Sequence, residues 1–278
     1  MTVSRSGPKR WWATVRAVAA LAGLAAAAAC GEETAEPGDG GPKGEVVVFA
    51  ASSLTDAFRE AAARFERIHP GSAVRLNLAS SAALATQINE GAPADVFASA
   101  DLAQMEVVAG KGKMDEPRMF ATNDLVVVTP RDGTTVRTFE ELAANGGRLI
   151  LAAKDVPIGR YAREVLANGS APSTGIAPEF GERVLANLRS EEANARAVLA
   201  KVVLGEADAG IVYRTDALAA GDAVRTIEIP TRFNVVASYP IAALSDAGNA
   251  TLARAWIAFI VSAEGHAILV RHGFGVPR

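Results

Sequence analysis

Short apolar runs alternate with amphipathic segments along the chain from Glu45 onward. Residues 45–51 (EVVVFAA) form a continuous apolar run that predicts a buried strand. Residues 54–68 place apolar side chains at steps of three and four, which predicts one buried face of a helix. The pattern repeats with strands predicted at 73–80 and 94–101 and helices at 81–91 and 102–109. This order predicts an α/β fold built on mainly parallel strands.

A second block of similar design begins near residue 124 and suggests a second lobe. The expected elements of the block and of the closing segment are strands at 124–130, 148–153, 209–213, 224–230 and 239–244, a loop at 154–159, and helices at 138–147, 160–168, 178–188, 195–205, 250–262 and 264–273. Periodicity alone does not show whether the last forty residues return to the first lobe.

The first 29 residues read as an export signal. Four basic residues precede or begin an apolar run at 17–29, which ends in small residues and is short for a membrane span. We therefore expect a signal peptide at 1–29, with a permanent membrane helix as the alternative. The stretch AAAC at 27–30 resembles a bacterial lipoprotein cleavage box, which implies lipidation of Cys30 and attachment to the membrane. The alternative is a free thiol just after an ordinary signal.

Residues 30–44 are acidic, rich in glycine and proline, and without apolar periodicity, so we expect a flexible tether. Removing the signal takes four of the 28 Lys and Arg residues and none of the 31 Asp and Glu residues, so the net charge falls from −3 to −7. A surface of that sign argues against a nucleic-acid partner. With three histidines and one cysteine, the sequence also offers no cluster suited to a chelated metal. These features predict a soluble, tethered, extracytoplasmic domain.

Two serine pairs, Ser52–Ser53 and Ser80–Ser81, lie where a predicted strand meets a predicted helix. One interpretation is helix capping, because serine is a preferred N-cap, and Asp56 would favour the positive end of its helix. The other is ligand binding, because open α/β sheets bind ligands at strand-to-helix junctions and helix starts attract anions. Both interpretations stay open from the sequence.

A secreted serine hydrolase is a further alternative. The chain has no G-x-S-x-G elbow, and its histidines, His69, His266 and His272, lie in or beside predicted helices with no sign of a triad. We therefore expect a protein that is not an enzyme.

Four stretches, FAASSLTDAF, ASSAALATQINEGAPADVFASAD, VPIGRYA and GEADAGIVYRTDA, carry a resemblance in colinear order. The chain from Glu45 onward resembles the bacterial molybdate-binding proteins, the extracytoplasmic receptors of molybdate ABC importers. The resemblance implies a two-lobed periplasmic-binding-protein fold of type II, in which each lobe is a mainly parallel sheet flanked by helices. It also implies a first lobe at 45–123 and 239–278, a second lobe at 124–238, and a ligand between them. We expect a monomer that delivers its ligand to a membrane permease.

Carried over position by position, the resemblance implies five ligand-binding residues. The serine hydroxyl donors fall on Ser53 and Ser81, the backbone donors on Ile158 and Ala195, and the last hydroxyl donor on Tyr213. For Tyr213, a half-buried tyrosine at the end of a strand is the alternative. No cofactor is implied.

The donor set suits molybdate, which at neutral pH is fully deprotonated and only accepts hydrogen bonds. Phosphate keeps a proton that would need an acceptor, and an unpaired buried donor costs roughly 1–3 kcal/mol. A carboxylate in the pocket, such as that of Asp56, would remove this preference. Tungstate has almost the same size as molybdate, whereas sulfate is smaller, and either remains a possible ligand.

Overall fold

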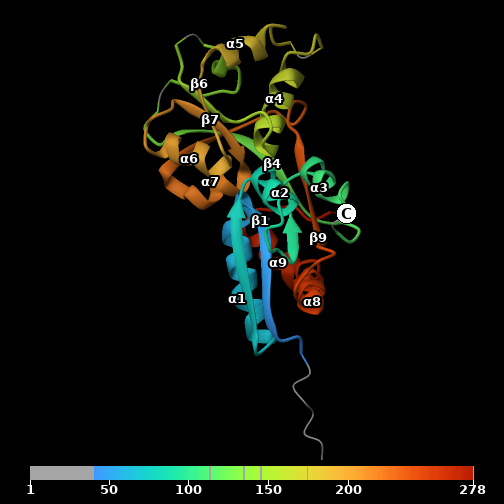
Figure 1. Ribbon diagram of the computed structural model, residues 1–278. Coiled ribbons are helices and arrows are strands. Elements are labelled where there is room, and N and C mark those ends of the chain that lie inside the picture. The colour runs from blue at the N-terminus through green and yellow to red at the C-terminus, as the bar shows by residue number, and fades with distance from the viewer. Residues whose placement is uncertain (1–40, 113, 134, 145, 174, 278) are drawn as a thin grey trace, which may run out of the picture. The chain divides into compact units, whose positions relative to one another are not determined.

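Nine strands of the described residues form one mixed sheet in the computed structural model (Figure 1). The model describes residues 41–277 except 113, 134, 145 and 174. The expected signal peptide, Cys30 and most of the expected tether therefore lie outside the described residues. The strand order is β2-β1-β3-β9-β4-β7-β5-β6, and β8 pairs with β4.

The first lobe is built around three parallel strands, with β1 paired to β2 on one side and to β3 on the other. Its elements are β1 (Gly44–Ala51), η1 (Ser52–Leu54), α1 (Thr55–Ile68), β2 (Ser72–Ala79), α2 (Ser81–Asn89), β3 (Val96–Ala98), α3 (Leu102–Ala109), α8 (Ala250–Ile260) and α9 (Ala263–Arg271). The helices α8 and α9 pack on α1, so two helices from the last thirty residues complete the first lobe (Figure 1).

Both faces of β1 are covered, which explains its continuous apolar run. Val46 and Val48 face a layer that includes Trp256, whose ring meets Phe58 edge-on with centroids 5.6 Å apart. Phe49 faces the opposite layer, formed with residues of α2 and α3. A strand buried on both faces has no polar alternation, as its sequence indicated.

The second lobe repeats the design with β5 paired in parallel to β6 and β7. Its elements are η2 (Glu140–Ala143), β5 (Leu149–Ala152), α4 (Pro157–Gly169), α5 (Phe180–Ala186), β6 (Leu188–Glu192), α6 (Ala195–Val203), β7 (Ala209–Tyr213), α7 (Arg214–Ala220), η3 (Gly221–Ala223) and β8 (Val224–Glu228).

Two long strands connect the lobes. β4 (Arg118–Pro130) pairs with β9 (Val236–Ala243) up to Asp124, and from Leu125 onward with β7 and β8. All of these pairings are antiparallel. Each lobe therefore contains three parallel strands together with antiparallel strands. The expected lobe boundaries at 124 and 239 fall inside these continuous strands and stay a prediction.

Several local expectations from the sequence were wrong. The helix expected at 138–147 is only the short 3₁₀ helix η2, and the strand expected from residue 239 begins at Val236. The helix expected from residue 160 begins at Pro157, because proline at the first helical position has the required φ and needs no hydrogen-bond acceptor. The strand expected at 124–130 begins six residues earlier, at Arg118. The strand β6 was not expected, because it is a polar edge strand with partly exposed side chains, and the helix expected up to 188 ends at Ala186.

Within the described part of the chain, no single helix is long and apolar enough to cross a membrane, and only the bent pair α8–α9 meets the length and composition jointly.

Candidate functional site

All five expected ligand positions line one pocket between the lobes, which has about 200 Å³ of empty space. Each position lies at the carboxyl end of a strand or at the helix that follows. The first lobe contributes Ser53 and Ser81, and the second contributes Ile158, Ala195 and Tyr213. The fold therefore brings together residues separated by up to 160 positions, and none of the described residues that line the pocket carries a charge.

The hydroxyl of Ser53 does not cap a helix. Ser53 lies in η1, and its Oγ lies 2.9 Å from the hydroxyl oxygen of Tyr239 on β9. Both side chains are buried. The capping interpretation is therefore wrong for Ser53, because its hydrogen bond runs from η1 to the side chain of Tyr239 in β9 and not to a backbone N–H of a helix start.

In the second serine pair, Ser80 and Ser81 have different hydrogen bonds, so the capping interpretation applies to only one of them. Ser80 is the N-cap of α2, and its Oγ accepts the Ala83 N–H at 3.2 Å. Ser81 is the first residue of α2, and its Oγ accepts the Ala100 N–H at 2.9 Å. Capping is therefore confirmed for Ser80, whereas Ser81 faces the pocket beside β3.

The start of α4 presents Ile158 to the pocket. N–H groups in a first helical turn have no acceptor inside the helix, so that of Ile158 is available to a ligand. Gly159 allows this helix start to approach β5 closely, because a Cβ at this position would lie 2.0 Å from the carbonyl oxygen of Ala153. The glycine of the VPIG stretch thus fixes where the Ile158 N–H is placed.

The start of α6 presents Ala195 in the same way. Asn194 is the N-cap, and its side-chain oxygen accepts the Ala197 N–H at 2.9 Å. The N–H of Ala195, the first helical residue, has no intrahelical acceptor. Two helices of the second lobe therefore direct the positive ends of their dipoles at one pocket.

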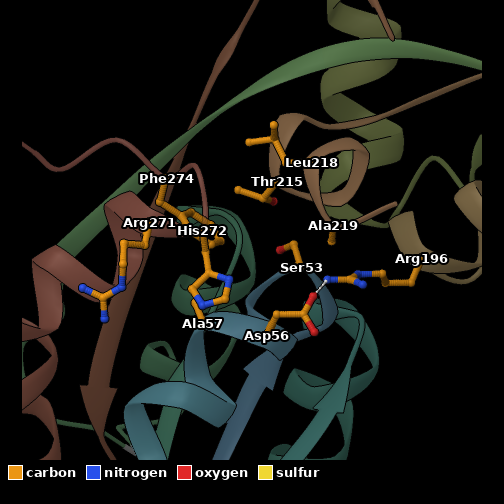
Figure 2. Close-up of a pocket in the computed structure, with 10 residues that line it drawn as sticks. All are labelled: Ser53, Asp56, Ala57, Arg196, Thr215, Leu218, Ala219, Arg271, His272 and Phe274. Atoms are coloured by element: carbon orange, nitrogen blue, oxygen red, sulfur yellow. Dashed lines mark hydrogen bonds and ion pairs between the residues drawn. The ribbon is translucent and has the colours of Figure 1, made fainter. Parts of the chain in front are cut away.

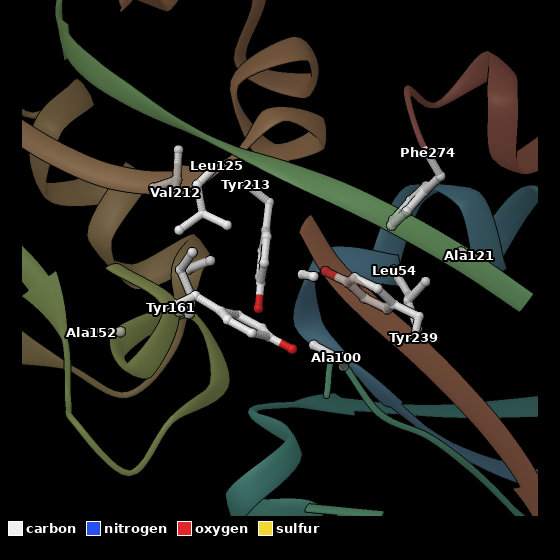
Figure 3. Close-up of a cluster of buried hydrophobic side chains, with 14 of the residues drawn as sticks. Leu54, Ala100, Ala121, Leu125, Ala152, Tyr161, Val212, Tyr213, Tyr239 and Phe274 are labelled. Carbon is white, nitrogen blue, oxygen red and sulfur yellow. The ribbon is translucent and has the colours of Figure 1, made fainter. Parts of the chain in front are cut away.

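Tyr213 ends β7 with its side chain only 2 % exposed. Its hydroxyl makes no well-aligned hydrogen bond among the described residues, although it lines the pocket and has the Tyr239 hydroxyl as a neighbour. Figure 3 shows this hydroxyl and those of Tyr161 and Tyr239 converging between the lobes. Burial raises the pKa of Tyr213 well above its ordinary value, so the hydroxyl keeps its proton and can donate it. A buried donor without an acceptor indicates a site for one.

Two carboxylates near the pocket are paired with arginines of the other lobe. Asp101, the N-cap of α3, binds Arg160 of α4, with Oδ2 2.8 Å from Nη2. Asp56 of α1 binds Arg196 of α6, as Figure 2 shows. Asp56 does not line the uncharged pocket. The expectation that the pocket prefers an anion without a proton is therefore not removed by this carboxylate.

Arg196 also pairs within its own lobe. Its Nε lies 2.7 Å from Oδ1 of Asp216 on α7, whose side chain is fully buried. Burial raises the pKa of Asp216 to about 6, and the charge of Arg196 opposes part of that rise.

A second, wider pocket of about 610 Å³ adjoins Ser53 (Figure 2). Asp56 and Arg196 line it together with His272, so an anion there would face a carboxylate. The smaller uncharged pocket is the better anion site. In the described residues, no group of three or more His, Cys, Asp and Glu side chains could hold a metal ion.

Sequence reasoning missed the residues behind the pocket. Tyr239 lies 186 positions from Ser53, and Arg160 lies 59 positions from Asp101. A tyrosine in an apolar strand and an arginine in the first turn of a helix carry no local signal of such partners. Only the topology of the sheet brings them together.

The chain belongs to the family of bacterial extracellular solute-binding proteins, whose model matches residues 46–275. The fold and the pocket between its lobes fit that class.

Two named relatives and one solved structure are similar over most of the chain. The molybdate-binding protein ModA of Mycobacterium tuberculosis is 37% identical over 259 residues, 91% of this chain and 94% of that protein. The molybdate-binding protein ModA of Escherichia coli is 32% identical over 276 residues, 96% and 99% of the two chains. The periplasmic molybdate-binding protein of Azotobacter vinelandii has the same fold, with a TM-score of 0.72, 20% identity, and coverage of 84% of this chain and 100% of that one.

Proposed function

We propose that this protein is an extracytoplasmic receptor that binds molybdate in the uncharged pocket and delivers it to the membrane permease of an ABC importer. The observation that carries the proposal is the buried Tyr213 hydroxyl, which makes no well-aligned hydrogen bond in a pocket whose described lining has no charge. Molybdate is proposed as the anion because the similar proteins of Mycobacterium tuberculosis and Escherichia coli are molybdate-binding proteins.

The proposed ligands are the hydroxyls of Ser53, Ser81 and Tyr213 and the N–H groups of Ile158 and Ala195. All of these groups can donate to an anion that has only acceptors. Hydrogen phosphate would bring a proton into a pocket without a carboxylate, which costs roughly 1–3 kcal/mol if that proton is unpaired. The charge of molybdate is balanced by helix starts and oriented peptides instead of a cation.

The two lobes share the proposed ligand. Two of the five donors belong to the first lobe and three to the second, so a bound anion holds the lobes together. Residues 45–123 with 239–278, and residues 124–238, are the proposed moving units, with β4 and β9 as the connection. The closed form is the one that the permease would recognise.

Tungstate is a proposed second ligand, because its size and charge nearly equal those of molybdate. Sulfate is the rival, because it is also a dianion without a proton, but it is smaller and would leave part of the donor set out of reach. Competition between the three anions decides their order.

A hydrolytic function has less support. The Ser53 hydroxyl meets Tyr239, and the Ser81 hydroxyl meets a backbone N–H, so neither described contact involves a base. His272 is bonded to Glu60 through Nε2 at 2.7 Å. We therefore propose binding without catalysis and without a cofactor.

Export, lipidation of Cys30 and a monomeric state complete the proposal. Mass spectrometry of the mature amino terminus tests the first two, because a diacylated cysteine adds a characteristic mass to the chain from residue 30.

Isothermal titration of the purified chain without residues 1–29 tests the function. We expect saturable, one-to-one binding of molybdate and tungstate, weaker binding of sulfate, and phosphate binding that is weaker still and measurable only at far higher concentration. No binding of molybdate at micromolar concentration would reject the proposal, and tighter binding of sulfate would reassign the ligand.

A further inference from the structure

Ser53 has a polar neighbour that no ligand role explains. Tyr239 is fully buried on β9, and its ring is held edge-on by Phe120, Tyr213 and Phe274, with centroids 5.5–6.3 Å apart. Its hydroxyl lies 2.9 Å from Ser53 Oγ. Because the ring cannot swing away without losing its packing, the position of this hydroxyl is fixed; Figure 3 shows two of the packing rings, Tyr213 and Phe274.

Asn123 gives this hydrogen bond a direction. Its side chain lies on β4 and is 2 % exposed. Its Nδ2 donates to Thr215 Oγ1 at 2.9 Å and to the Tyr239 oxygen at 3.4 Å. An amide nitrogen only donates. The Tyr239 oxygen therefore accepts from Asn123, and its neighbours Ser53 and Tyr213 are the two partners open to its proton. Ser53 Oγ lies at 2.9 Å, so we assign the proton to Ser53.

Ser81, the other proposed serine ligand, also has an oxygen that accepts a hydrogen bond, and there the donor is known. Ser81 Oγ accepts the backbone N–H of Ala100 at 2.9 Å, and a backbone N–H can only donate. A hydroxyl whose oxygen already accepts directs its own proton elsewhere. For Ser81 that proton is free for the pocket, and Tyr239 would produce the same result at Ser53.

We propose that Tyr239, held by Asn123, is a positioning residue that makes Ser53 a hydrogen-bond donor and thereby sets the preference of the pocket for fully deprotonated over protonated oxyanions. This inference rests on the proposed function. Without the Tyr239 hydroxyl, the Ser53 oxygen has an open acceptor position, and the proton of hydrogen phosphate or hydrogen arsenate finds a partner there. The absence of a carboxylate lowers phosphate affinity, and the orientation of Ser53 removes the remaining acceptor.

The test compares Tyr239→Phe with the wild-type chain by titration with molybdate, phosphate and arsenate at pH 7.5. The substitution keeps the ring and removes one hydroxyl. We expect molybdate affinity to fall about three- to tenfold, the size of one hydrogen bond. We expect phosphate and arsenate affinity to rise or stay level, so that the ratio of molybdate to phosphate affinity falls by at least about threefold.

Tyr161→Phe is the matched control, because Tyr161 is a buried tyrosine near the same space whose hydroxyl does not bond Ser53 (Figure 3). In Tyr161→Phe, the ratio of molybdate to phosphate affinity should equal that of the wild type. Asn123→Ala should lower the ratio in the same direction, and combining it with Tyr239→Phe should lower the ratio no further than Tyr239→Phe alone. Additive effects would mean that Asn123 does not act through Tyr239.

The outcomes separate the two proposals. If the wild-type chain does not bind molybdate, the proposed function fails before any variant is considered. If it binds molybdate and Tyr239→Phe keeps the wild-type ratio, or binds molybdate more tightly, the hydrogen bond does not orient Ser53 as a donor and this inference is overturned. If the melting curve of Tyr239→Phe shows that this variant is unfolded, Asn123→Ala is used instead. An unchanged ratio of molybdate to phosphate affinity in Asn123→Ala would then overturn the inference.

Discussion

Arg160 of α4 and Asp101 of α3 form an ion pair between the two lobes, with Nη2 2.8 Å from Oδ2. Asp101 is 1 % exposed, so its charge depends on this partner and on the Gln104 N–H that it accepts. Arg196 of α6 reaches Asp56 of α1 in the same way. Each arginine lies one or two residues after a proposed backbone donor, so the same two helix starts supply the N–H groups and link the lobes.

Arg160→Gln should weaken closure around the ligand. Removing Arg160, whose side chain is partly exposed, leaves the buried Asp101 carboxylate without its cation in the closed form, which then becomes less stable relative to the open form. We expect molybdate to dissociate about ten times faster, with a smaller change in association rate, as measured by stopped-flow fluorescence. Arg148→Gln is the control, because the pair of Arg148 with Asp208 lies within the second lobe. Equal dissociation rates in both variants would contradict a role for Arg160 in closure.

Ser80→Ala and Ser81→Ala should have different effects although the residues are adjacent. Ser80 caps α2, so its loss should lower the free energy of unfolding by about 1 kcal/mol and change affinity little. Ser81 is a proposed ligand, so its loss should lower molybdate affinity at least tenfold. Combining Ser81→Ala with Ser53→Ala should abolish binding while the fold is retained. Urea unfolding and titration of each variant measure both quantities, and a reversed pattern would exchange the two roles.

The repeated strand and helix pattern was sufficient to predict the α/β fold and most of its elements. The buried strand β1 and the helix α1 carry strong periodic signals, because each is packed along its whole length. The edge strand β6 and the early part of β4 do not, because their polar or mixed side chains pack only partly. Pairing of the long strands is a tertiary property, which no local pattern contains.

The sequence predicted the positions that line the site but not the contacts that surround them. Resemblance pointed to five positions that the structure brings to one pocket, but their role as ligands remains a prediction. The sequence did not indicate which serine caps and which faces the pocket, because adjacent serines share the same local signal. The partners Tyr239 and Arg160 were missed, since their significance comes from contacts across the fold.

Tyr213→Phe should stabilise the free protein and weaken binding together. The Tyr213 hydroxyl is buried and makes no well-aligned hydrogen bond among the described residues, and such a group costs about 1–3 kcal/mol. We expect the free energy of unfolding of the free protein to rise by about 1 kcal/mol and the molybdate affinity to fall at least tenfold. Thermal melting without and with molybdate measures both effects. A loss of stability in the free protein would show that the hydroxyl already has an acceptor.

Asp216 should make stability fall as pH rises. Its pKa in the folded protein is about 6, above its ordinary value of 3.8, because the side chain is fully buried. Between these values the folded state binds more protons than the unfolded state. The contribution of Asp216 to stability is therefore greatest below pH 4, declines as the pH rises to about 6, and is constant above that.

Asp216→Asn removes this titration, so its comparison with the wild type isolates the effect. From pH 4.5 to pH 7.5, the free energy of unfolding of the wild type should fall relative to the variant by on the order of 1–3 kcal/mol. Asp208→Asn is a control of opposite sign, because Arg148 holds the pKa of Asp208 below its ordinary value, and that stabilisation is lost as the pH falls. Urea unfolding at both pH values measures the differences. Parallel pH profiles for the wild type and Asp216→Asn would mean that Arg196 keeps Asp216 ionised throughout this pH range.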